Sequence, residues 1–230
     1  MATHVHTPPK LENGLNKDLP KRLVLACGAL VYELVELIKR NPAVSDSIDL
    51  HCLPAHLHNT PQFIAHQVDE FLTKHSNAYT DLFVGYGDCG TAGELDKVLV
   101  KHGAQRLPGA HCYEFFAGNT VFECMLEEEL GTFFLTDYLV KFFDRLVLEG
   151  LGINEQPELR DLYFKHYKKL VYLAQSHDLE LQKLARQQAK QLGLVYEYRF
   201  VGTMGLESTI DFPLKENFSK QQISIEVNHD

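Results

Sequence analysis

The sequence contains no tryptophan, no run of lysine or arginine, and no uninterrupted apolar stretch long enough to cross a bilayer. Its 22 basic residues are outnumbered by 31 acidic residues, which gives a net charge of −9 at pH 7. Such a charge disfavours binding to the phosphate backbone of nucleic acids and to anionic membrane surfaces. We therefore expect neither a nucleic-acid partner nor a membrane partner.

Close-spaced cysteine pairs are absent as well, and the five cysteines do not follow the pattern of a small disulfide scaffold. An odd number of scattered cysteines favours a reducing compartment. The first twenty residues are polar and lack the apolar segment of a secretory signal. Together these features predict a cytoplasmic protein.

What the chain does contain is 45% apolar residues over 230 positions, enough for one sizeable core or for two small lobes around a cleft. Apolar runs of strand length alternate with helical patterns of ten or more residues. The predicted strands cover residues 23–26, 48–53, 81–85, 132–135, 170–174 and 194–201, and a further short strand precedes His111.

This alternation is typical of an α/β fold, Rossmann-like, with a mostly parallel sheet and helices on both faces. Residues 194–201 alternate apolar and polar side chains, so we expect the last strand to lie antiparallel at a sheet edge. We divide the chain into a polar lead-in (1–20), a single α/β domain (21–202, with two sub-lobes as an option) and a polar tail (203–230).

Three cysteines, Cys27, Cys89 and Cys112, each follow a predicted strand and precede or begin a predicted helix. If the strands are parallel, their carboxyl ends share one rim, where open α/β sheets bind ligands. A helix N-terminus also favours the thiolate, which is the form of cysteine that binds metals. His58 and His111 fall on the same rim and either could complete a metal site.

Three interpretations of these cysteines stay open. The first is a metal site that holds zinc with one open position, or an iron–sulfur cluster with one iron lacking a protein thiolate. The second is a metal-free pair of catalytic thiols facing each other across a cleft, as in two-lobed amino-acid racemases. The third is that they are small buried residues under loops, as we expect for Cys124. Cys52 and His51 end another predicted strand, and the sequence leaves their part in the site open.

Gly85, Gly87 and Gly90 form a Gly-x-Gly-x-x-Gly pattern after the third predicted strand. A dinucleotide fingerprint belongs after the first strand, so we predict instead that the backbone passes close to a metal or small ligand here. Asp88 and Glu114 are the candidates for general acid/base chemistry. Either could instead cap a helix or orient a ligating histidine.

Several segments resemble a known family. They are ACGAL at 26–30, LPA and LHN within 53–59, GYGDCGT at 85–91, PGAHCYEFF at 108–116, LEGLG at 148–152 and LVYLAQ at 170–175. These segments are similar to the family called domain of unknown function 1638, over about residues 23–201. The resemblance implies a bacterial or archaeal cytoplasmic protein of unassigned activity, encountered alongside corrinoid-dependent methyl-transfer proteins.

In that setting zinc would activate a thiol acceptor, and an iron–sulfur centre would keep cobalt reduced. His111 and Cys112 are similar to the His-x-Cys zinc motif of cobalamin methyltransferases, although here they are adjacent. We therefore expect a metal-dependent enzyme that acts on a small molecule, in one-carbon metabolism. The alternative from another class is an accessory protein that binds a metal or corrinoid and hands it on.

Overall fold

The computed structural model describes residues 21–203, 205 and 206. The lead-in (1–20) lies outside the described residues, and so does the predicted tail apart from residues 203, 205 and 206. In the described part, no helix has both the length and the apolar character that a membrane crossing requires.

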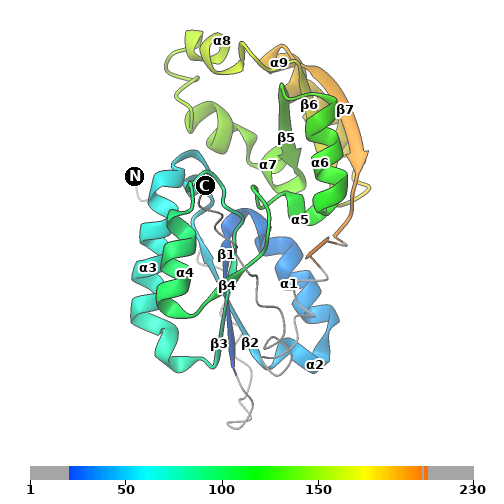
Figure 1. Cartoon of the computed structure of the whole chain (residues 1–230). Coiled ribbons are helices and arrows are strands. Elements are labelled where there is room, and N and C mark those ends of the chain that lie inside the picture. The colour runs from blue at the N-terminus through cyan, green and yellow to red at the C-terminus, as the bar shows by residue number, and fades with distance from the viewer. Residues whose placement is uncertain (1–20, 204, 207–230) are drawn as a thin grey trace, which may run out of the picture.

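The strands form two separate parallel sheets, which Figure 1 shows one above the other. The first has the order β2-β1-β3-β4 and consists of β1 (Arg22–Cys27), β2 (Ile48–Leu53), β3 (Asp81–Gly85) and the two-residue β4 (Gln105–Arg106). The second has the order β5-β6-β7 and consists of β5 (Thr132–Thr136), β6 (Lys169–Ala174) and β7 (Val195–Phe200). The predicted α/β class with parallel strands is thus confirmed.

One expectation about the strands is wrong. The last strand, β7, runs parallel to β6, with Lys169 beside Val195 and Ala174 beside Phe200. The reason is the connection between them, because the 14-residue helix α9 (Leu179–Leu192) carries the chain back to the starting end of the sheet. β7 does lie at the edge of its sheet.

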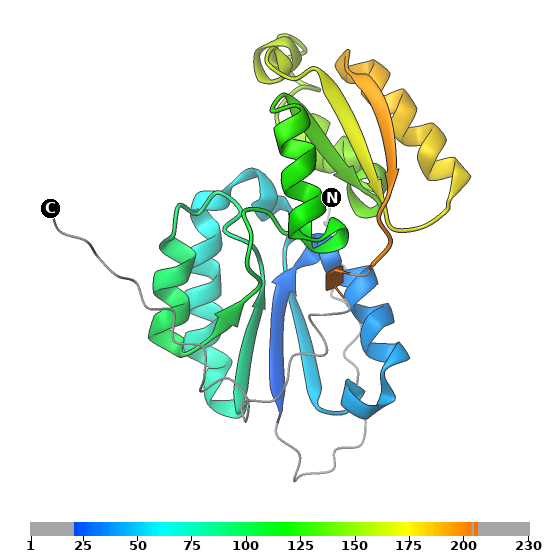
Figure 2. The same cartoon turned by 45° about the vertical axis from the view of Figure 1, so that its right-hand side comes forward.

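Helices cover both faces of each sheet (Figures 1 and 2). The helices between β1 and β4 are η1 (Gly28–Leu30), α1 (Val31–Arg40), α2 (Pro42–Ser45), η2 (Ala55–Asn59), η3 (Pro61–Phe63), α3 (Ile64–His75), η4 (Ser76–Ala78) and α4 (Glu94–His102). Those that follow are α5 (Glu114–Ala117), α6 (Asn119–Glu128), α7 (Asp137–Lys141), the π-helical turn η5 (Asp144–Glu149) and α8 (Glu158–Phe164). We call the first sheet with η1 to α4 the first lobe, and the second sheet with α6 to α9 the second lobe.

The packing around β6 explains why this strand carries apolar side chains on both faces of the sheet. Val171 and Leu173 on β6 pack with Phe122 of α6, whereas Tyr172 belongs to the same apolar cluster as Leu181 of α9. Because successive side chains of a strand point to opposite faces, β6 is apolar at every position after Lys169.

The two lobes meet at the carboxyl ends of their sheets (Figure 1). Cys27 and Leu30 of the first lobe share one buried cluster with Tyr138 of the second. A direct polar link is the 2.5 Å hydrogen bond from Asn59 Nδ2 to the carbonyl oxygen of Leu146. Functional side chains at the ends of either sheet therefore face the boundary between the lobes.

Candidate functional site

The structure brings Cys27, Cys89 and Cys112 together at the carboxyl end of the first sheet. Cys27 is the last residue of β1, and its side chain and that of Cys112 are buried, whereas Cys89 is partly exposed. The three thiols lie close enough to affect one another's pKa, and Cys112 adjoins both Cys27 and Cys89.

The two buried thiols differ in acidity. The neighbouring Cys112 lowers the pKa of Cys27, with smaller contributions from the backbone of Ala29 and from Tyr86, although burial opposes this. The proximity of Cys27 and Cys89, together with burial, raises the pKa of Cys112 well above its usual range. Cys27 therefore loses its proton more readily than Cys112.

Two loops hold Cys89 against Cys112. The backbone N–H groups of Asp88 and Cys89 donate to the carbonyl oxygens of Gly109 and Ala110, at 3.0 and 2.7 Å. Cys89 itself adopts a left-handed conformation with φ of 49°, which is uncommon for a residue other than glycine. Strained backbone of this kind persists only where its surroundings hold it, and it is concentrated at functional sites.

The predicted glycines allow close approach of the backbone. A Cβ atom on Gly87 would lie 2.9 Å from the nitrogen of His111, and one on Gly85 would lie 2.9 Å from the Cβ of Ala26. Gly90 has a left-handed φ of 82°. The neighbours that require glycine at 85 and 87 are the protein's own atoms, and the ligand-binding role of the three stays a prediction.

Asp88 and Glu114, the predicted acid/base residues, both bind loop backbone. Asp88 accepts from the N–H groups of residues 90, 92 and 93 and from the hydroxyl of Thr91, which lowers the pKa of its carboxyl group. Glu114 Oε1 accepts from the N–H groups of Ala110 and His111 at 2.9 and 2.7 Å. These bonds give both carboxylates a structural task, and their acid/base role stays a prediction.

The two predicted histidines, His58 and His111, both contact the ring of Tyr113. His111 stacks on Tyr113 at a centroid distance of 4.9 Å, and His58 meets the same ring edge-on at 6.4 Å. Burial lowers the pKa of both imidazoles, and the proximity of His111 lowers that of His58 further. Both rings are thus kept neutral, which is the form that binds metals.

Cys52 and His51, whose part in the site the sequence left open, have different surroundings. Cys52 on β2 lies beside Ala26 of β1, next to Cys27. Burial and then the charge of Cys27 raise the pKa of Cys52 to about 12. His51 instead contacts the ring of Phe71 at 5.1 Å. Across the described residues, no group of three or more histidine, cysteine, aspartate or glutamate side chains is arranged so that it could hold a metal ion.

Sequence reasoning missed a polar network at the end of the second sheet. Asp137 is buried and accepts hydrogen bonds from the Tyr172 hydroxyl (2.6 Å), the Gln175 N–H group (3.0 Å) and the Ser176 hydroxyl (2.5 Å). Its own N–H group donates to Gln175 Oε1 at 2.7 Å. The available signal was its position, since Asp137 directly follows the strand that ends at Thr136.

Glu33 on α1 is a second missed residue, at the boundary between the lobes. Its Oε2 atom is buried and has no hydrogen-bond partner among the described residues. Burial and, to a smaller degree, nearby Asp137 raise the pKa of its carboxyl group to about 7, against the opposing effects of its own backbone N–H group and of Lys141. A buried carboxyl group of this kind is half-protonated near neutral pH.

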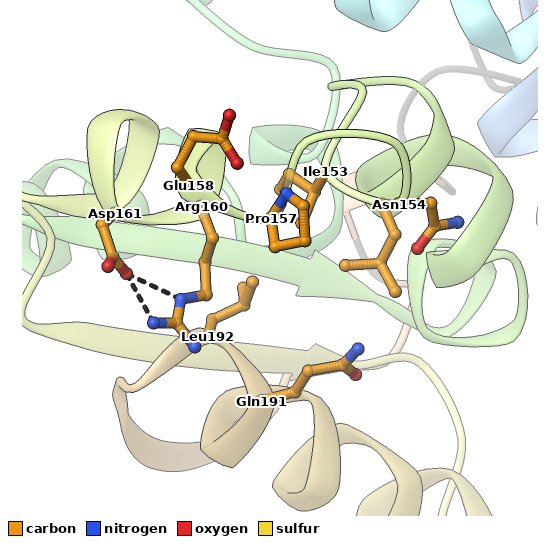
Figure 3. Close-up of a pocket in the computed structure, with 9 residues that line it drawn as sticks. Ile153, Asn154, Pro157, Glu158, Arg160, Asp161, Gln191 and Leu192 are labelled. Carbon is orange, nitrogen blue, oxygen red and sulfur yellow. Dashed lines mark hydrogen bonds and ion pairs between the residues drawn. The ribbon is translucent and has the colours of Figure 1, made fainter.

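A pocket of about 480 Å³ lies elsewhere in the second lobe, between α8 and the end of α9. Figure 3 shows its lining, which includes Ile153, Pro157 and Leu192 beside the ion pair of Arg160 with Asp161. None of its lining residues belongs to the predicted site.

Comparison with known proteins identifies a family to which no activity is assigned. The model of the family described as "Protein of unknown function (DUF1638)" matches residues 52–210, a range that includes Cys89 and Cys112 and begins after Cys27. Comparisons with curated proteins and with solved structures find no match. Since the match covers most of the sequence, the chain belongs to the DUF1638 family.

Proposed function

We propose that Cys27, Cys89 and Cys112 form a thiolate site for a soft metal, zinc or an iron–sulfur cluster, in an enzyme that acts on a small molecule. The observation that carries this proposal is the convergence of three thiols from separate segments, one of which has a lowered pKa despite full burial. The most specific form of this proposal is methyl transfer that involves a corrinoid.

The electrostatics of Cys27 support a cation at this place. The groups that lower its pKa are a thiol, a backbone amide and a hydroxyl, and none of these carries a positive charge. Burying a thiolate without a positive partner is costly. A metal ion would supply that charge and would release the proton that Cys112 now holds.

Binding would require the side chains to turn toward one centre, because the described cysteines and histidines do not surround a common point. Cys89 is partly exposed and lies on a loop, so it has the most freedom to move. His58 or His111, both neutral, would provide a fourth ligand. A small molecule would reach the site from the exposed side of Cys89.

The proximity of Cys27 to Cys112 argues against these two residues as the catalytic pair of the metal-free alternative. An acid/base pair of thiols acts on opposite faces of a substrate carbon, which must fit between the two sulfurs. Here the two thiols lie close enough to shift each other's pKa.

Elemental analysis with a visible spectrum, on full-length protein purified without oxygen, tests the proposal. We expect about one metal centre per chain in the wild type, and less than a tenth of that in Cys112→Ser and Cys27→Ser. Cys124→Ser is the matched control, because Cys124 lies outside the cluster and is exposed, so the expectation of its burial is wrong. Absence of zinc and iron from the wild type, or equal metal in all variants, would contradict the proposal.

Turnover separates an enzyme from an accessory protein. Metal-loaded protein is incubated with a methylated thiol or a methylcorrinoid and an acceptor thiol, and the methylated product is quantified. Turnover lost in Cys89→Ser supports the enzyme. Stoichiometric transfer of the metal or corrinoid to an acceptor protein, without turnover, supports the accessory role.

A further inference from the structure

The strand β7 has one unoccupied edge in the described structure. Its pairing partner there is β6, and β7 is the last strand of its sheet (Figure 2). An edge strand presents a row of backbone N–H and C=O groups that can pair with another strand. This edge lies in the second lobe, apart from the cysteine cluster.

The sequence of β7 is self-complementary about Tyr198. Glu197 and Arg199 flank this tyrosine with opposite charges, and the aromatic residues Tyr196 and Phe200 lie one step further out. In an antiparallel pair centred on Tyr198, Glu197 of each strand lies directly opposite Arg199 of the other. Opposite charges and aromatic rings in directly opposed positions stabilise strand pairs.

The charged side chains are already held in place for such pairing. Glu197 and Arg199 lie opposite Val171 and Leu173 of β6, and therefore on the sheet face that α6 covers. Arg199 bonds to Glu197 and to Glu128 of α6. A single charge at the centre of an edge would prevent self-pairing, whereas this pair of opposite charges matches its own copy.

Both ends of the strand are apolar and exposed. Val195 is 71% exposed and Phe200 is 48% exposed. In the antiparallel pair Phe200 lies opposite Tyr196, and Val195 lies opposite Val201. Pairing would therefore cover apolar surface at each end of the strand.

The chain that follows β7 turns away from this edge. The N–H groups of Val201 and Gly202 donate to the carbonyl oxygen of Ala174, at the end of β6. Further on, Gly205 packs so closely against Phe115 that a Cβ atom would lie 1.5 Å from its carbonyl oxygen. The described residues after β7 leave its edge open.

We propose that β7 pairs with β7 of a second copy of this chain in antiparallel orientation, joining two three-stranded sheets across a two-fold axis at Tyr198. Such an interface is isologous, with the same surface on both copies. The contact is strand addition to a sheet edge.

Sedimentation equilibrium on full-length wild type, Glu197→Arg, Arg199→Glu and the double swap tests this pairing. We expect a wild-type dimer, and a dissociation constant at least about tenfold higher for each single change, because like charges then face each other. The double swap restores opposite charges and should return the constant to within about threefold of the wild type.

Tyr198→Lys and Tyr198→Phe separate pairing from effects within one chain. The lysine variant places two cations together at the two-fold axis and leaves the bond of Arg199 to Glu197 in place, so we expect a folded monomer. The phenylalanine variant should remain a dimer. Circular dichroism of each variant checks that it has folded.

Three outcomes would overturn the proposal. The first is a wild type that stays monomeric up to about 100 µM. The second is a dimer that all the charge changes leave unaltered. The third is a monomer whose β7 amides are protected from hydrogen exchange independently of concentration, because another segment of the same chain would then cover the edge.

Discussion

The two sheets have the same parallel arrangement, but different functional groups lie at their carboxyl ends. Both are parallel, and both direct their carboxyl ends to the boundary between the lobes (Figure 1). The first ends in thiols, of which Cys27 and Cys112 are buried. The second ends in a carboxylate, Asp137, surrounded by donors from β6 and the loop after it.

The difference lies in how well the buried polar groups at the carboxyl ends of the two sheets are satisfied. Asp137 receives a hydroxyl donor, a backbone donor and a second hydroxyl donor at 2.5–3.0 Å. In the first lobe, the Tyr86 hydroxyl is buried near Cys27 and makes no hydrogen bond of ordinary geometry to a described residue. A satisfied network stabilises a fold, whereas unsatisfied groups indicate where a ligand or ion is expected.

The largest effect we predict is in the Asp137 network. Asp137→Ala removes the acceptor of the Tyr172 and Ser176 hydroxyls and of the Gln175 N–H group. The Tyr172 hydroxyl is buried, and a buried donor without an acceptor costs about 1–3 kcal/mol. The other two donors lie nearer to solvent, and each lost bond costs about 1 kcal/mol, so the free energy of unfolding should fall by roughly 4 kcal/mol. Urea denaturation at pH 7 measures this.

The control for that prediction is Asp161→Ala, because Asp161 pairs with Arg160 at an exposed position. An exposed ion pair contributes less than about 1 kcal/mol. Equal losses in the two variants would show that the Asp137 network does not stabilise the second lobe.

The next prediction concerns Glu33, where the two lobes meet. Its pKa rises from 4.5 to about 7 on folding, so between these values the unfolded chain is ionised there and the folded chain is protonated. The contribution of Glu33 to stability is therefore complete below pH 4.5 and is lost as pH rises to 7. Glu33→Gln should remove this loss and raise the free energy of unfolding at pH 8 by on the order of 2–3 kcal/mol.

Urea denaturation from pH 4 to pH 8 tests the Glu33 prediction, with Glu36→Gln as the matched control. Glu36 lies on the same helix and its side chain is 59% exposed. The wild type and the control should show the same pH dependence, and Glu33→Gln a weaker one. Parallel curves for all three would mean that Glu33 titrates as it does in the unfolded chain.

The sequence predicted the parts of this fold that depend on local patterns. Apolar runs gave β1, β3 and β6, and the strand-end positions of Cys27, Cys89 and Cys112 placed them on one rim, where the structure brings them together. Parallel topology alone was enough for that step, since it fixes which ends of the strands are neighbours.

The rest depends on contacts between distant segments. Periodicity shows that a strand is buried but not which sheet it joins, so the sequence left one domain or two sub-lobes open. The backbone N–H groups that Asp88 and Glu114 bind lie just before helices, in keeping with the capping alternative that the sequence left open. Asp137 and its partner Gln175 are 38 positions apart, and Glu33 looked like any polar residue of a helix.

The smallest effect we predict is at the direct polar link between the lobes. A Cβ atom on Gly150 would lie 2.2 Å from Asn59 Nδ2 and 2.6 Å from the carbonyl oxygen of Leu146, so Gly150→Ala should displace the Asn59 side chain. We expect a loss of about 1–2 kcal/mol in the free energy of unfolding, close to that of Asn59→Ala, because both changes break the same hydrogen bond. The double variant should lose less than the sum of the two single variants, since the bond can be lost only once. Strictly additive losses in urea denaturation would mean that Gly150 and Asn59 act independently.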